Sequence, residues 1–286
     1  MTSGSGVEQE RRLTLPGDRS IGSLFTRERS NTSEHGWRRV ADARGQIALV
    51  GDVEVRLWIS REGSLDLSGL KMLAPDALDE LILEWGVFQD EDLSFLSHLT
   101  GIRRLSVAYT RIGDPGLAYI SWLQGLEDLD LRRTRISDTG LSRIRALTSL
   151  ISLDLSHTRI GDDGIGNLCP FQSLARLELA GTWIGGIGST ALRQLPELRH
   201  LDMGATWVDD NALAHIGRLH ALRTLDLGGT QIGDRGLARL YGLSNLQLLD
   251  LTTDSCFEPF ARPNFITQAG LTALKKALPH CEVNVH

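Results

Sequence analysis

The stretch LRTLDLGGTQIGDRGLARLYGL, residues 222–243, sets the pattern for most of the chain. Its frame, L-x-x-L-x-L-x-x-T-x-I-x-D-x-G-L-x-x-[IL]-x-x-L, also recurs upstream. The frame threonine returns every 24 residues, at Thr110, Thr134, Thr158, Thr182, Thr206 and Thr230. A fixed period in this range indicates a solenoid, in which each unit packs only against its neighbours. We therefore expect one elongated domain, although 286 residues could also form two globular ones.

The first half of the frame predicts a short strand followed by a turn. In the segment L-x-L, alternate residues such as Leu129 and Leu131 point to the same side, so the strand has one buried face. The threonine that follows, such as Thr134, lies where the chain turns off the strand. Its hydroxyl can bond backbone groups there, and stacked copies would form a ladder of such bonds.

The second half of the frame predicts a short helix. Its Asp suits a helix N-cap, because the carboxylate accepts hydrogen bonds from the amides of the first turn. This Asp occurs at Asp114, Asp138, Asp162, Asp210 and Asp234. Apolar residues three apart, such as Leu117, Ile120 and Leu123, indicate one face of a helix. No unit can bury its apolar faces alone, so stacked units must share one continuous core.

These residues resemble the leucine-rich repeat, in a bacterial variant that carries T-x-I-x-D-x-G-L where many relatives have Asn. The resemblance covers residues 53–285 and rests on many positions in phase. It implies an α/β fold, a curved leucine-rich-repeat solenoid with a parallel β-sheet on the concave side and short helices on the convex side. It implies little about function, because such repeats are mostly generic binding scaffolds.

The chain divides into four predicted segments. Residues 1–36 lack periodicity and are expected to be disordered or loosely attached. Residues 37–77 are expected to form an N-terminal cap, with a β-hairpin over 46–60 and a degenerate first repeat. Residues 78–253 hold the regular repeats, and 254–286 hold an insertion loop, the last helix and a C-terminal cap. The phase predicts strands centred on Leu81, Leu105, Leu129, Leu153, Leu177, Leu201, Leu225 and Leu249.

The last regular unit carries ten extra residues, placed within 254–265. They include three phenylalanines, Phe257, Phe260 and Phe265. An apolar cluster in a loop indicates a contact, so the loop either covers the open core of the last unit or projects as a second binding contact. We favour the first alternative, because a terminal unit must be covered.

Composition and short motifs argue against several classes of function. With 36 acidic and 30 basic residues the net charge is −6, which argues against a nucleic-acid partner. The three cysteines have no paired spacing, so neither a disulfide framework nor a zinc site is expected. The motif GIGSTA at 186–191 matches a dinucleotide fingerprint, but it falls in phase with the repeat, and we expect no cofactor. No apolar run reaches signal-peptide or membrane-span length, so the bacterial cytoplasm is the simplest location.

An acidic row is predicted along the concave face. The residue between the two strand leucines is Asp130, Asp154, Glu178, Asp202, Asp226 and Asp250 in successive units. Neighbouring strands lie about 4.8 Å apart, and carboxylates this close disfavour ionisation unless cations compensate them. The row either receives a basic partner surface or is screened by nearby arginines. The screening candidates are Arg132, Arg133, Arg176 and Arg223.

A second row follows the frame threonine and is predicted to stand on the rim of the concave face. It contains Arg111, Arg135, Arg159, Trp183 and Trp207. Trp and Arg are enriched in binding hot spots, so we expect a partner there. Trp85 and Tyr109, two positions earlier in their units, could extend this patch. The alternative is that the tryptophans fold onto adjacent turns and cover glycines such as Gly181 and Gly185.

The sequence therefore predicts a non-enzymatic interaction module that binds a protein through the concave face and the Arg/Trp rim. No nucleophile–base pair and no compact metal-ligand set is evident, since the histidines are scattered. The alternative is an inhibitor or immunity-type protein that caps a partner enzyme. An enzyme or a cofactor-binding protein ranks last, because little interrupts the repeat to build a pocket.

Overall fold

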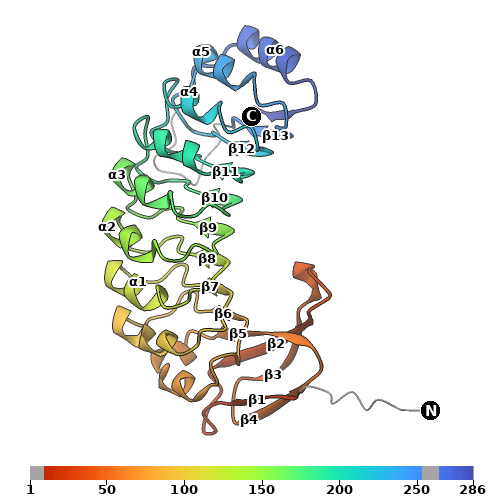
Figure 1. Ribbon diagram of the computed structural model, residues 1–286, viewed down its shortest axis with the longest axis vertical. Helices are drawn as coiled ribbons and strands as arrows, with labels where there is room; N and C mark the ends of the chain where they lie inside the picture. Colours follow the sequence, from red (N-terminus) through yellow and green to blue (C-terminus); the bar gives the residue numbers. More distant parts are fainter. Residues whose placement is uncertain (1–9, 253–263, 286) are drawn as a thin grey trace, which may run out of the picture.

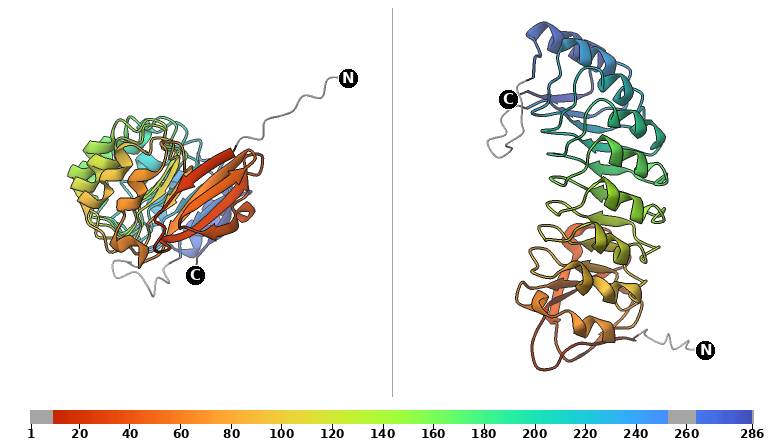
Figure 2. Two further views of the ribbon diagram at one scale, coloured as in Figure 1. Left: turned by 90° about the horizontal axis from the view of Figure 1, so that it is seen from below. Right: turned by 90° about the vertical axis from the view of Figure 1, so that its left-hand side faces the viewer.

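The computed structural model describes residues 10–252 and 264–285 and shows a curved solenoid (Figure 1). A long sheet lines the concave side, and helices cover the convex side, where Figure 2 shows them stacked unit upon unit. The predicted fold class is confirmed. Within the described ranges, no helix is long and apolar enough to cross a membrane.

The main sheet is parallel from β5 to β14, and each strand pairs with the strand of the next unit. The strands are β5 (Val53–Ile59), β6 (Glu80–Ile82), β7 (Arg104–Ser106), β8 (Asp128–Asp130), β9 (Ser152–Asp154), β10 (Arg176–Glu178), β11 (His200–Asp202), β12 (Thr224–Asp226), β13 (Leu248–Asp250) and β14 (Glu282–Asn284). The eight predicted strand centres are correct. Each central leucine lies opposite the next one, as Leu129 does Leu153, and none is more than 2% exposed.

Short helices return the chain along the convex side. The α-helices are α1 (Asp114–Ile120), α2 (Asp138–Leu141), α3 (Asp162–Ile165), α4 (Leu213–Ile216), α5 (Asp234–Leu237) and α6 (Gln268–Ala277). Further 3₁₀ helices span Glu34–Gly36, Gly63–Leu65, Ser68–Met72, Asp90–Ser97, Ser142–Ile144, Gly166–Leu168, Gly188–Gln194 and Ala238–Leu240. The predicted face Leu117, Ile120 and Leu123 is fully buried, as the spacing requires.

The frame threonines bond within their own units. In all six, the buried hydroxyl donates to the carbonyl three residues earlier, as Thr134 does to Leu131 at 2.6 Å. The predicted bond from hydroxyl to backbone is confirmed. It closes the turn after each strand, but it does not link one unit to the next.

The frame aspartates do link the units, which corrects their predicted role as N-caps. The residue at the N-cap is instead Gly113, Ser137, Gly161 or Gly233, and none of these helices has a side-chain cap bond. Each carboxylate accepts a backbone N–H of the following unit at 2.7–2.8 Å. The pairs are Asp114–Ser137, Asp138–Gly161, Asp162–Gly185, Asp210–Gly233 and Asp234–Thr267.

Glycine in the frame makes this contact possible. A Cβ atom at Gly164 would lie only 2.2 Å from Oδ1 of Asp138. The frame glycine therefore leaves room for the carboxylate of the preceding unit. In the fifth unit, counted from the one that holds β6, Gly186 replaces the Asp, and the α-helix gives way to the 3₁₀ helix Gly188–Gln194. The bond between the fifth and sixth units is missing there as a consequence.

The N-terminal unit is more ordered than the sequence indicates. Residues 10–36, predicted to be disordered or loosely attached, contain β1 (Glu10–Thr14) and β2 (Gly22–Glu28). The predicted hairpin over 46–60 is also wrong. β4 (Gln46–Val50) pairs with β1, whereas β5 pairs with β2, which lies between β5 and β3 (Arg38–Asp42). These strands find partners far along the chain, a pairing that local alternation cannot reveal.

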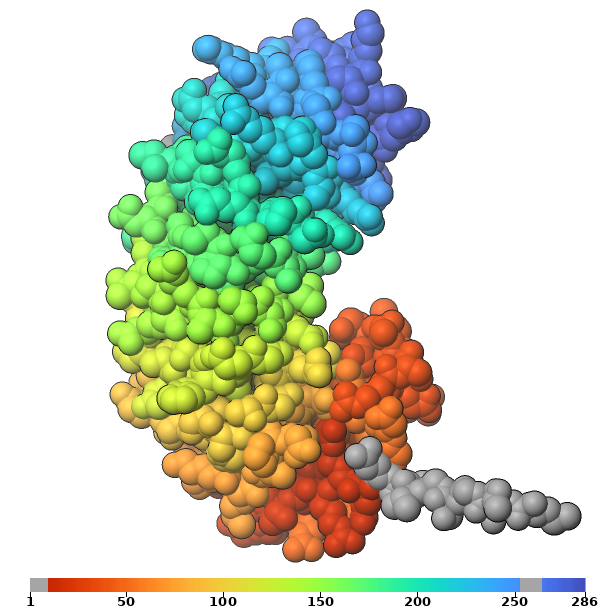
Figure 3. Space-filling model, in the orientation of Figure 1, coloured from red at the N-terminus to blue at the C-terminus, as the bar shows by residue number. Residues whose placement is uncertain are grey.

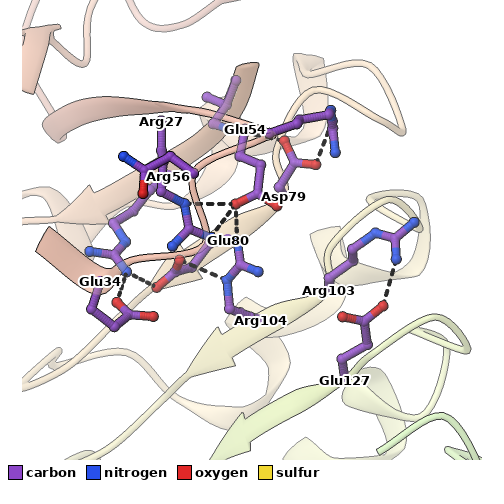
Figure 4. A network of polar contacts seen from close by, with 12 residues as sticks. Arg27, Glu34, Glu54, Arg56, Asp79, Glu80, Arg103, Arg104 and Glu127 are labelled. Atoms are coloured by element: carbon purple, nitrogen blue, oxygen red, sulfur yellow. Dashed lines mark hydrogen bonds and ion pairs between the residues drawn. The ribbon is translucent and has the colours of Figure 1, made fainter. Parts of the chain in front are cut away.

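A partly buried ion-pair network joins this N-terminal unit to the first repeats (Figure 4). Glu54 of β5 binds Arg27 of β2 and, at 2.7 Å, Arg104 of β7. The ring of Trp37 lies against the guanidinium groups of Arg27 and Arg56, 4.6 and 4.2 Å from the ring centroid. Burial alone would raise the pKa of Glu54, but hydrogen bonds and charge from the two arginines lower it. The N-terminal unit is therefore fixed over β5–β7 of the concave face.

Most of the insertion lies outside the described residues, so its two alternative roles stay predictions. Its end is visible. The side-chain amide of Asn264 donates to the carbonyl of Leu251 at 3.0 Å, as a frame threonine does in other units. Phe265 follows and donates its N–H to Ile232, so it belongs to the rim row rather than to the extra residues.

Replacing Asp138 with Ala tests the bond between units. The change leaves the half-buried N–H of Gly161 without its partner, so we expect the free energy of unfolding to fall by about 1–3 kcal/mol. The neighbouring exposed Asp163 is the control, and Asp163→Ala should change stability by less than about 0.5 kcal/mol. Urea denaturation measures both. Equal effects of the two substitutions would show that the contact is not stabilising.

Candidate functional site

The open part of the concave face begins where the N-terminal unit ends. Figure 3 shows a notch on this side, between the N-terminal unit and the later repeats, which are coloured green to blue. Beyond it the sheet from β8 to β13 forms a floor, which carries the predicted acidic row. In strand register, Asp130 lies opposite Asp154, and the row continues through Glu178, Asp202, Asp226 and Asp250.

Five of these acids have a structural task. Oδ1 of each Asp accepts the backbone N–H two residues later, at 2.7–3.0 Å. This bond turns the chain at the end of each strand, as Asx turns do. This bond accounts for the Asp that recurs in the L-D-L sequence of these strands. The second carboxylate oxygen remains available for other contacts. Glu178 forms no such bond with the backbone, and its carboxylate instead accepts from Arg176 at 3.4 Å.

Burial and mutual repulsion raise the pKa values of several carboxyl groups in the acidic row. Burial raises the pKa of Asp202 to about 7, and the carboxylate of Asp226 adds to the effect. Burial raises the pKa of Asp226 and of Asp130 to about 6. The pKa of Glu178 is also raised, by burial and then by the charge of Asp154. Part of the row is therefore protonated near neutral pH, as expected for closely spaced carboxyl groups.

Arginines screen one half of the floor. Arg132 lies 2.9 Å from Asp130 and 3.9 Å from Asp154, and Arg176 lies 3.4 Å from Glu178. The predicted screening by Arg133 and Arg223 is not seen in the described part of the chain, where neither pairs with the row.

The other half of the floor is open. Across residues 10–252 and 264–285, no Lys, Arg or His forms an ion pair with Asp202, Asp226 or Asp250. A depression of about 270 Å³ lies over this half, lined by Asp202 and Asp226 and by His200 of β11.

A ladder of left-handed residues runs beside the floor. Trp85, Tyr109, Arg133 and His157 occupy the same frame position, and each has a φ between 54° and 60°. Trp85 stacks on Tyr109, with centroids 4.0 Å apart and planes at 13°. The guanidinium of Arg133 lies 5.7 Å from the Tyr109 centroid, and its Nη2 is 3.4 Å from Nε2 of His157.

The ladder departs from the residue type that its backbone favours. Gly181, Ala205 and Gly229 fill this position in later units, and a left-handed backbone costs residues other than glycine about 1–2 kcal/mol. Large side chains kept at such a cost indicate a functional surface. The sequence pattern predicted Trp85 and Tyr109 as part of a binding patch, but not Arg133 and His157. The signal was that one frame position carries large side chains in four consecutive units and only Gly or Ala in the next three.

The rim row stands on the edge where each unit turns from the sheet toward its helix. Arg111, Arg135 and Arg159 are exposed. Trp183 and Trp207 are 58% and 46% exposed. The exposure predicted for the two tryptophans is therefore correct, although whether they bind a partner stays a prediction.

The tryptophans also lie beside glycines, as the alternative predicted, and one of these, Gly185, is a glycine that it named. A Cβ atom on Gly161 would lie 3.9 Å from Cβ of Trp183, and one on Gly185 would lie 3.8 Å from Cβ of Trp207. Each tryptophan thus stands next to a glycine of the preceding unit and is about half exposed. Packing against the turn therefore buries only part of each tryptophan side chain.

The described residues hold no group of three or more His, Cys, Asp or Glu side chains arranged to hold a metal ion. The structure instead brings together three surfaces. These are the acidic floor, the ladder and the rim, and each takes one side chain from each of several units. Such surfaces can recognise a macromolecule by charge and by aromatic contact.

Replacing Asp202 with Asn tests the cost of the carboxyl group on the floor. The pKa is about 7 in the folded protein against an ordinary value of 3.8, so the unfolded state binds fewer protons between these pH values. Stability therefore falls as the pH rises through this window. Asn keeps an acceptor for Gly204 and never ionises. We expect Asp202→Asn to match the wild type near pH 4 and to exceed it by at least about 1 kcal/mol at pH 8, allowing for solvent screening.

The exposed Asp163 provides the control for this measurement. Asp163→Asn should give the same difference from wild type at both pH values, by urea denaturation. A difference for Asp202→Asn that does not change with pH would contradict the proposed proton on the floor.

Comparison with known proteins supports the repeat assignment. A family model described as "Leucine Rich repeat" matches residues 124–144, 146–169 and 219–240. Comparison with curated proteins gives no match. The fold is similar to that of internalin C2 (InlC2) from Listeria monocytogenes, at 25% identity and a TM-score of 0.55, over 78% of this chain and 84% of that one. It is also similar to an internalin (InlF) from the same species, at 23% identity and a TM-score of 0.54, over 77% of this chain and 70% of that one.

These matches agree with the frame and with the sheet that it builds. Each matched segment is about one 24-residue period long, and the fold similarity extends over about three quarters of the chain. The chain is therefore a leucine-rich-repeat protein, with a fold typical of protein-interaction modules.

Proposed function

We propose that this protein is a non-enzymatic binding module, which holds a protein partner against its concave face and its Arg/Trp rim. The observation that carries the proposal is the exposure of three tryptophans on this side, Trp85, Trp183 and Trp207, each 46–60% exposed. Tryptophan is normally well buried, and exposed aromatic groups near arginines are typical of binding hot spots.

The arrangement of the rows supports a large partner rather than a small ligand. Each unit adds one residue to the floor and one to the rim, so a partner that lies along the solenoid contacts many units together. A stable protein interface covers about 800 Å² on each side, which one unit cannot supply. The depression over Asp202 and Asp226 is open and lined by several charged side chains, unlike the enclosed apolar pockets that hold small molecules.

The open half of the floor favours a second candidate function. Asp202, Asp226 and Asp250 form no ion pair with the described cations, so a basic partner surface would neutralise them. An inhibitor or immunity-type protein that caps an enzyme with a basic active site would use the floor in this way. Identification of the partner separates this candidate from a general scaffold. A cytoplasmic location stays a prediction.

A double substitution of the rim tryptophans tests the proposed surface. The partner is isolated from the native host on the immobilised protein, identified by mass spectrometry, and titrated against purified variants. We expect Trp183→Ala with Trp207→Ala to weaken binding by more than about 2 kcal/mol, because two hot-spot side chains are lost. Unchanged circular dichroism and melting temperature must show that the fold is intact.

Trp122 provides the matched control, because it is 60% exposed but follows α1 on the helical side. Trp122→Ala should leave the affinity within about twofold of wild type. Normal binding by the double variant, or an equal loss with Trp122→Ala, would refute the rim as a binding surface.

A further inference from the structure

We propose that the rim binds an amphipathic α-helix of the partner, one that presents carboxylates along one half and apolar side chains along the other. The proposal rests on the proposed function and names the chemistry of its partner. Its basis is the order of residues along the rim. Three arginines occupy three consecutive units, two tryptophans occupy the next two, and Gln231 and Phe265 follow.

The arginine half of the rim is a cationic surface without internal compensation. Arg111, Arg135 and Arg159 are exposed, and none forms an ion pair within the described residues. Many other arginines of the chain do pair, as Arg103 does with Glu127 at 2.5 Å. Three unpaired guanidinium groups in adjacent units fit a row of carboxylates, which arginine binds through paired hydrogen bonds.

The tryptophan half fits apolar side chains. Trp183 and Trp207 lie in consecutive units, and the exposed ring of Phe265 lies in the same row, two units beyond Trp207. A partner segment on this row therefore changes from acidic to apolar along its length. The boundary falls between Arg159 and Trp183.

The spacing of the units selects a helix rather than an extended strand. Backbone bonds of 2.8–2.9 Å, from Arg159 to Ile136 and from Trp183 to Ile160, hold neighbouring units together along the rim. Adjacent units there keep about the spacing of paired strands, near 4.8 Å. An α-helix lying along the rim presents one side chain per turn, every ~5.4 Å, so over four units its side chains fall out of register with the rim residues by only about 2.4 Å. Side chains on one face of an extended strand recur every ~6.8 Å, so over the same four units they fall out of register by about 8 Å, more than one whole unit.

The neighbouring floor argues against a nucleic acid as the ligand of these arginines. The net charge of the chain is −6, and the acidic row runs along the sheet beside the rim. A phosphate backbone that follows the rim would meet this row, whereas a helix keeps its carboxylates on one face. The tryptophan half also offers no charge to a continued phosphate chain.

Synthetic peptides test the proposal with the full-length protein. The probe is an Ala-rich helical peptide of about 20 residues, with one Glu per turn along the first half of one face and one Leu per turn along the second half. The control peptide has the same composition, with Glu and Leu distributed around the helix. We expect the probe to bind at least about tenfold more tightly than the control, in fluorescence anisotropy at low salt, and to weaken as salt is added.

Matched triple variants locate the site. We expect Arg111→Gln, Arg135→Gln and Arg159→Gln together to weaken probe binding at least about tenfold. The control triple, Arg143→Gln, Arg145→Gln and Arg239→Gln, removes the same charge from exposed arginines on the helical side. It should bind the probe within about twofold of wild type, because net charge alone has little effect on a local contact.

Several outcomes would overturn the inference. These are equal binding of probe and control peptides, equal loss in the two triple variants, and tighter binding of single-stranded DNA or of anionic lipid vesicles than of the probe. The isolated partner separates this inference from the proposed function. If the partner binds the rim triple variant normally but loses affinity for the Trp183→Ala, Trp207→Ala variant, the helix inference is wrong while the proposed function stands.

Discussion

One side-chain hydrogen bond recurs between successive units along most of the solenoid and positions each unit on the next. The frame aspartate, as at Asp138, accepts a backbone N–H of the following unit, here that of Gly161 at 2.7 Å. The parallel strand pairs join the same two units on the concave side, so each unit is held both at its sheet and where it turns toward its helix. Because a repeat contacts only its neighbours, the spacing of the whole solenoid follows from these local joints. Gly186 removes one of them, between the fifth and sixth units.

This regular spacing turns single residues into rows. A position that recurs every 24 residues becomes a line of side chains along the solenoid, and its chemistry can change from unit to unit while the core stays constant. The floor uses this freedom to gather carboxyl groups, with the pKa of Asp202 raised to about 7 by burial first and by its neighbour Asp226 second. The rim gathers arginines and then tryptophans, and the ladder accepts backbone strain to stack Trp85 on Tyr109. Opposite charges therefore lie on adjacent surfaces of one scaffold.

The period alone predicts the sheet, since residues in phase must share a face, and Leu129 and Leu153 lie opposite each other as expected. It does not predict where the Asp138 carboxylate goes, because a helix cap and a bond to the next unit require the same residue. The N-terminal strands escape prediction because their partners are distant in sequence, as for β1 and β4. The rows of the candidate site follow from the phase. Their environment does not, since the screening of Asp130 by Arg132 and the stack on Tyr109 depend on side-chain directions.

Native-state amide hydrogen exchange tests the joint between units most directly. The N–H groups of Ser137, Gly161, Gly185 and Gly233 are bound by the aspartate of the preceding unit, whereas Asp209, at the same frame position, follows the unit that has Gly186. We predict that the four bonded amides exchange only through large-scale opening and that the Asp209 amide exchanges at least about tenfold faster. Equal protection of Asp209 and Gly161 would contradict the account, because the carboxylate bond would then add nothing to the joint.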